Sequence, residues 1–145
     1  AGLVGTLGVF YFLTDSGPAG KIPFGPGSHV IITGGSSGIG LATAVKFRKR
    51  RCNVTIIARN RDKLAEACAA ISQEAEGCDG ELNVVSADVA SKDGIDEAVK
   101  AACVKYHNRV DILVCSAGVS RPGRLEEIPQ DMYERMMQVN YLGSL

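Results

Sequence analysis

The sequence predicts an α/β fold in which helices cover a parallel sheet. From His29 onward, short apolar runs rich in valine and isoleucine alternate with segments whose apolar residues recur at helical spacing. A glycine-rich turn, with Gly34, Gly38 and Gly40, joins the first apolar run to the first helical segment. The 145 residues are 46% hydrophobic and 22% charged, which is typical of one globular domain with its own core.

The first half of the pattern contains two strand–helix units. Residues 29–33 form the first expected strand, and residues 38–50 form the first helix after the glycine turn. The second strand is expected over 53–58 because it carries three β-branched apolar residues. Asn60 is a suitable cap for the helix that follows, and Gly77 ends that helix.

The second half repeats the alternation. The third strand is expected over 82–87, a third helix follows Ser91, the fourth strand spans 110–115, and the last helix carries residues 132–140. Short loops and right-handed crossovers place these strands in the order 3-2-1-4. The fold class is therefore a Rossmann-type doubly wound parallel sheet, whose ligand site lies where the strand order reverses.

The glycine turn is predicted to bind a diphosphate. Gly34 makes the turn, Gly38 lets the backbone approach the anion, and Gly40 lets the helix pack close to the strand. The free N–H groups and positive dipole end of the helix then face the phosphates. Ser36 and Ser37 add hydroxyl donors beside the same turn.

The spacing Gly-x-x-x-Gly-x-Gly, preceded by Thr33, resembles the short-chain dehydrogenase/reductase family over about residues 25–145. The string Asn140-Tyr141-Leu142-Gly143 matches that family as well. The resemblance implies that Ile39 belongs to the cofactor-binding turn together with the glycines and serines around it.

Arg59 indicates which dinucleotide is preferred. It ends the second strand, about 20 residues after the glycine turn, where an NAD-specific site has Asp or Glu on the ribose 2′-hydroxyl. A guanidinium there suits the 2′-phosphate of NADPH, and Lys63 lies close by. The alternative is that Arg59 merely ends a strand at the surface.

Asp88 and Val89 follow the third strand. In the resembled family this pair closes over the adenine, and the Asp accepts from its exocyclic amine. Asp88 is equally suited to a local role at the start of the helix that follows Ser91.

Ala117 and Gly118 match the family's small residues after the fourth strand, beside the cofactor. Cys115 and Ser116 depart from it, because they replace two asparagines that stabilise the sheet in the family. A reactive role for Cys115 is a further alternative, although no base is adjacent in the sequence.

Asn140 is the catalytic residue that the resemblance implies, by kinking its helix or by holding a water of the proton relay. The alternative is a polar residue on an exposed helix face. Tyr141 is not expected to be the catalytic tyrosine, since the family's Ser and Tyr-x-x-x-Lys pair lie well downstream. These residues are therefore expected after Leu145, in a longer protein.

Composition argues against several other functions. Sixteen basic and sixteen acidic residues give no net charge to attract nucleic acid. The basic cluster 48–51 is expected to complement a helix dipole and to remain solvated. Five cysteines without a Cys-x-x-Cys pair, and two histidines apart from them, predict reduced thiols and no metal site.

The amino-terminal segment has a different character. Residues 1–13 are apolar and uncharged, shorter than the roughly 20 residues of a membrane span, and are expected to be the remnant of a membrane anchor. A signal-peptide remnant and an ordinary apolar extension are the alternatives. Residues 14–28, rich in glycine and proline, read as a linker to the NADP-binding half of a reductase domain at 29–145.

The resemblance extends to membrane-anchored members of the family, which face the cytosol from the endoplasmic reticulum. It implies NADPH-dependent reduction of a lipid-like ketone by a protein that can form homo-oligomers. A reductase or dehydrogenase for another carbonyl compound, such as a steroid or retinoid, and a non-catalytic dinucleotide-binding module stay open.

Overall fold

Four parallel strands form the sheet in a computed structural model that describes residues 24–145. They are β1 (His29–Thr33), β2 (Asn53–Ala58), β3 (Leu82–Ser86) and β4 (Ile112–Cys115). Their order is β3-β2-β1-β4, and all three pairings are parallel, so the predicted topology is confirmed. The apolar segment 1–13 and all but the last five residues of the linker 14–28 lie outside the described residues.

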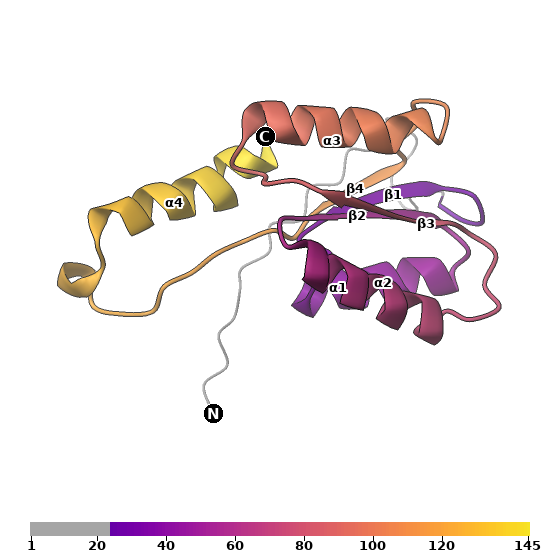
Figure 1. The fold of residues 1–145 in the computed structure, drawn as a ribbon, viewed down its shortest axis with the longest axis horizontal. Coiled ribbons are helices and arrows are strands. Elements are labelled where there is room, and N and C mark those ends of the chain that lie inside the picture. Colours follow the sequence, from indigo (N-terminus) through magenta and orange to yellow (C-terminus); the bar gives the residue numbers. More distant parts are fainter. Residues whose placement is uncertain (1–23) are drawn as a thin grey trace, which may run out of the picture.

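Helices cover both faces of this sheet. Figure 1 shows α1 (Gly38–Lys49) and α2 (Arg61–Glu74) on one face and α3 (Lys92–Val104) on the other. The helix α4 (Gln130–Asn140) projects to the side, between the 3-10 turns η1 (Leu125–Glu127) and η2 (Leu142–Ser144). The doubly wound layering follows from the strand order, because the chain changes face where β1 meets β4.

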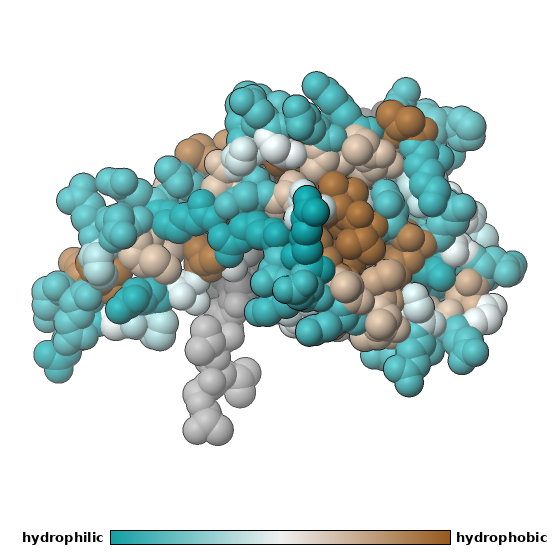
Figure 2. Space-filling model, viewed as in Figure 1, coloured by the Kyte–Doolittle hydropathy of each residue, from teal (hydrophilic) through white to brown (hydrophobic). Residues whose placement is uncertain are grey.

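The core has two parts, because successive strand residues point to opposite faces. Val30 and Ile32 pack with α1 and α2, whereas Ile31 packs against α3 together with Ile57. Burial on both faces explains why neither central strand alternates regularly between apolar and polar residues. At the edge strand β3, apolar side chains gather between the helical layers on the face seen in Figure 2, and they are only partly buried.

The helices begin where the sequence predicts. The side chain of Asn60 accepts the backbone N–H of Lys63 at 2.9 Å, and that of Ser91 accepts the N–H of Gly94 at 3.3 Å. Both caps satisfy an N–H group that the first helical turn leaves free. Asn60 lies two residues after the end of β2, so this cap starts α2 close to the carboxyl end of the sheet.

Two local predictions were wrong. The fourth strand begins at Ile112 instead of residue 110. Val110 is exposed, and the carboxylate of Asp111 accepts a hydrogen bond from the backbone N–H of His29. The basic cluster is not uniformly solvated, because Arg48 is only 8% exposed. Its neighbours are engaged locally: Lys49 pairs with Glu74, Arg51 pairs with Asp79, and Arg50 lies over the ring of Phe24.

Candidate functional site

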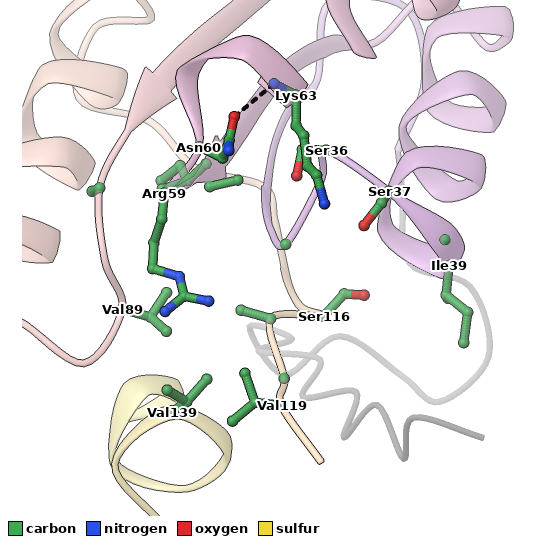
Figure 3. A pocket seen from close by; sticks show the side chains of 17 residues that line it. Ser36, Ser37, Ile39, Arg59, Asn60, Lys63, Val89, Ser116, Val119 and Val139 are labelled. Atoms are coloured by element: carbon green, nitrogen blue, oxygen red, sulfur yellow. Dashed lines mark hydrogen bonds between the residues drawn. The ribbon is translucent and has the colours of Figure 1, made fainter. Parts of the chain in front are cut away.

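A pocket of about 710 Å³ opens at the carboxyl ends of the strands, where the strand order reverses. Figure 3 shows its walls: the turn after β1 with the start of α1, the residues that end β2, and the loops that follow β3 and β4. Val139 of α4 closes the wall opposite the glycine turn. Segments far apart in the sequence thus meet at one site.

The glycines of the turn have the geometry that a diphosphate cradle needs. Gly34 has φ +71°, and a Cβ there would lie 2.7 Å from the backbone of Ala117. A Cβ on Gly40 would clash with the carbonyl oxygen of Gly34, so this glycine sets how closely α1 approaches the turn. Gly38 lines the pocket and differs, because it has φ +55° and a Cβ there would meet open space.

Most of the predicted binding residues line this pocket. They are Gly34, Ser36, Ser37, Gly38, Ile39, Arg59, Lys63, Val89, Ala117 and Gly118. Gly40, Asp88 and Asn140 are not among the lining residues, and each contacts the pocket wall or its supports instead. A dinucleotide fits such a pocket chemically, because the glycine turn offers backbone N–H groups and Arg59 and Lys63 offer positive charge.

Sequence reasoning missed part of the lining. Ile57, Ala58, Asn60, Ala87, Val119 and Val139 also border the pocket, as does Ser116, which was treated as a departure from the family. Six of these seven lie at strand ends or in the residues that follow, which is the signal that would have found them. Gly35 was also missed: a Cβ there would lie 2.6 Å from the side chain of Ile56, so its role is packing against β2.

Arg59 and Lys63 supply the positive charge of the pocket. Arg59 leaves the end of β2, and its guanidinium reaches across the pocket toward Val89 (Figure 3). Its side chain is 54% exposed and therefore accessible to a charged ligand. Lys63 lies in the first turn of α2, placed there by the Asn60 cap.

Asp88 lies behind this wall and is held by three groups. Its Oδ1 accepts the backbone N–H of Ala90 at 3.0 Å, and its Oδ2 accepts from Nη2 of Arg135 at 2.7 Å and lies 3.9 Å from Nη1 of Arg59. Burial alone would raise the pKa of Asp88, but the hydrogen bonds from Arg135 and Ala90 and the nearby arginine charges outweigh burial and lower it. The carboxylate is therefore ionised and paired, and it also has the local role near Ser91 that the sequence left open.

Asn140 ends α4 and joins it to the loop after β4. Its side-chain amide donates to the carbonyl of Val119 and accepts from the N–H of the same residue, both at 2.8 Å. The amide thus pairs with the backbone as a neighbouring strand would, at the point where the loop borders the pocket. Its role in proton transfer stays a prediction.

Cys115 has no catalytic environment. The thiol is buried at the end of β4, and burial raises its pKa, so the nucleophilic thiolate is disfavoured. Next to it, the N–H of Ser116 donates to the carbonyl of Thr33, which ties β4 to β1 without the family's asparagines.

Two further features are absent from residues 24–145. No group of three or more metal-ligating side chains occurs among them. None of the helices formed by these residues has both the length and the apolar character to cross a membrane.

The family follows from this fold and from the sequence together. The sequence profile described as short chain dehydrogenase matches residues 28–145, and the chain therefore belongs to the short-chain dehydrogenase family of oxidoreductases.

Among curated relatives, the chain is 38% identical over 121 residues to the 3-ketodihydrosphingosine reductase of Bos taurus, a match that covers 83% of this chain and 36% of the relative. The 3-dehydrosphinganine reductase of Danio rerio is also 38% identical, over 82% of this chain and 36% of its own length. The chain thus spans little more than a third of these relatives.

Among solved structures, the L-sorbose reductase of Gluconobacter frateurii, complexed with NADPH and L-sorbose, has a TM-score of 0.73 and 28% identity. The match covers 83% of this chain and 44% of that enzyme.

Proposed function

We propose that the intact protein is an NADPH-dependent short-chain reductase that reduces the ketone of 3-ketosphinganine to give sphinganine. The observation that carries the proposal is the placement of Arg59 and Lys63 in the same pocket as the glycine turn. The cations lie where the adenosine ribose of a dinucleotide would lie, and the turn lies where its diphosphate would lie.

The cofactor preference follows from charge. A guanidinium at the end of β2 offers planar donors to a 2′-phosphate, whereas NAD-specific sites have a carboxylate at this position. The chain's own part is to bind and orient: the N-terminus of α1 holds the diphosphate, and Val89 and Val139 make apolar contacts in the adenosine half.

The reaction class follows from the family. When bound, NADPH supplies the hydride for the carbonyl carbon. Asn140 contributes by fixing the pocket loop at Val119. The proton donor is expected to be the tyrosine of a Tyr-x-x-x-Lys pair in the intact protein, with its pKa lowered by the lysine.

The substrate is supported by similarity to the ketosphinganine reductases over 83% of this chain. A long-chain ketone dissolves in a bilayer, so a reductase tethered to the endoplasmic reticulum, facing the cytosol, would meet its substrate at high local concentration. Residues 1–13 are the segment proposed to provide that tether. The proposed partners are then the membrane lipid and, in a homo-oligomer, a second copy of the chain. Nucleic acid is not a proposed partner.

The direct test is turnover by the intact protein, with 3-ketosphinganine presented in lipid vesicles and sphinganine quantified. We expect product with NADPH and much less with NADH. Steroid, retinoid and sugar ketones serve as competing substrates, and faster turnover of one of them would replace the substrate proposed here. Cofactor binding without turnover of any ketone would favour a non-catalytic dinucleotide-binding module.

A further inference from the structure

A carboxylate shared by two arginines stands beside the pocket. Oδ2 of Asp88 lies 2.7 Å from Arg135 and 3.9 Å from Arg59. Only the contact with Arg135 is a hydrogen bond. Arg135 comes from α4, whereas Asp88 follows β3 and Arg59 follows β2. The arginine that lines the pocket is therefore the more weakly held of the two.

We propose that Arg135 is a positioning residue for cofactor choice: by engaging Asp88, it leaves the guanidinium of Arg59 available to the 2′-phosphate of NADPH. This inference rests on the proposed function, in which Arg59 binds that phosphate.

The charge balance gives the physical reason. Arg59 and Arg135 carry two positive charges against the single negative charge of Asp88, so the cluster keeps one positive charge next to the pocket. Without Arg135, Asp88 and Arg59 would form a neutral pair, and the carboxylate would repel an incoming phosphate. NADH has no 2′-phosphate and would be affected far less.

The geometry supports a strong hold by Arg135. Its side chain is 32% exposed and that of Asp88 is 33% exposed, so the pair is better shielded from solvent than Arg59, which is 54% exposed. Oδ1 of Asp88 is fixed by the N–H of Ala90, which limits how far the carboxylate turns toward the pocket. A partly buried, charge-assisted hydrogen bond is stronger than an exposed ion pair at a longer distance.

The test compares dissociation constants of NADPH and NADH for the intact protein and its variants. Arg135→Met should weaken NADPH binding about tenfold and NADH binding less than about twofold. Arg135→Lys, which keeps the charge, should restore most of the preference. Lys92→Met is the matched control, because it removes one charge from the exposed Lys92–Asp96 pair of α3 and should leave both constants unchanged.

A second comparison, made in an Asp88→Asn variant, distinguishes a positioning role of Arg135 from a merely structural role in holding α4. In Asp88→Asn, no carboxylate remains to capture Arg59, so adding Arg135→Met should leave the NADPH-to-NADH ratio as it is in Asp88→Asn alone. Equal weakening of both cofactors by Arg135→Met, or the same loss of preference in the Asp88→Asn background, would overturn the inference while leaving the proposed function intact. A wild-type protein that binds neither cofactor would overturn both.

Discussion

At the scale of single residues, Arg59 gives the sharpest test of cofactor choice. Arg59→Asp replaces a donor for the 2′-phosphate with a carboxylate suited to a ribose hydroxyl. We expect NADPH affinity to fall at least about thirtyfold while NADH affinity is kept or improved. Titration of both cofactors measures this, with Arg61→Asp as the neighbouring control outside the pocket lining. Equal loss of both would mean that Arg59 is structural.

A second prediction concerns two glycines of the turn: Gly38 is needed for ligand binding, whereas Gly40 is needed for the packing of α1. Gly38→Ala places a methyl group in open space at φ +55°, so it should cost only about 1 kcal/mol of stability but obstruct the diphosphate. Gly40→Ala forces α1 away from the carbonyl of Gly34 and should lower the melting temperature more. Thermal unfolding and dinucleotide binding, measured on both variants, separate the two effects; the reverse ranking of melting temperatures would contradict this reading.

At the scale of elements, His29 joins β1 to its neighbours and makes stability depend on pH. Its ring nitrogens lie 2.7 Å from the carbonyl of Arg109 and 2.9 Å from the hydroxyl of Thr55, and its ring packs on Tyr106. Burial lowers the pKa of His29 below its usual value of 6.5, although the Arg109 carbonyl and the charge of Asp111 act against burial.

The unfolded chain therefore binds a proton at His29 more readily than the folded chain does. The contribution of neutral His29 to the free energy of unfolding is fully present above pH 6.5, and it is lost as the pH falls from 6.5 toward the lowered pKa. We expect the denaturant midpoint of the intact protein to decrease across that window. His29→Gln should be less stable at neutral pH but depend less on pH, whereas His107→Asn, at an exposed position, should keep the dependence. An unchanged slope in His29→Gln would assign the effect to other groups.

The side chain of Asn140 ties the helix α4 to the loop after β4 at Val119. Asn140→Ala removes both partners of the Val119 backbone, so the loop after β4 should open more often. Hydrogen exchange at the Val119 amide should accelerate severalfold, with little change in the strands. Gln130→Ala, at the other end of α4, should leave Val119 protected; equal acceleration in both variants would mean that α4 frays as a whole.

At the scale of the whole molecule, strand order and most element bounds were predictable from the sequence. Apolar periodicity, the caps at Asn60 and Ser91 and the glycine turn are local signals, and the rules for parallel crossovers convert them into a topology. The pocket lining was predicted only in part: the residues of the glycine turn and Arg59 were found from their motif, whereas other residues at the strand ends, such as Ala58 and Ala87, were not.

The remaining features depend on contacts that leave no local pattern. Asp88 and Arg135 are 47 positions apart, and Val119 and Asn140 are 21 apart, so neither pair is visible in periodicity or spacing. The burial of Arg48 was missed for a similar reason, because a cation in the last turn of a helix is ordinarily solvated. Side-chain contacts between different helices, strands and loops are thus the features that could not be predicted from the sequence.

The membrane association proposed for the intact molecule can be tested without substrate. If residues 1–13 belong to an anchor, the intact protein should remain in the membrane pellet after alkaline carbonate extraction, and removal of that segment should release it. An unrelated apolar anchor in its place should restore retention. Full release of the unaltered protein would contradict the anchor.

The direction of the sheet has a practical consequence for handling this protein. β1 runs five residues, or about 16 Å, from His29 to the turn that borders the pocket. Whatever is joined to the chain ahead of Phe24 therefore attaches at the end of the strands opposite the pocket. A fluorescent reporter or a surface-coupling tag fused there would leave the mouth of the pocket open, so immobilised protein should be suitable for screening small molecules.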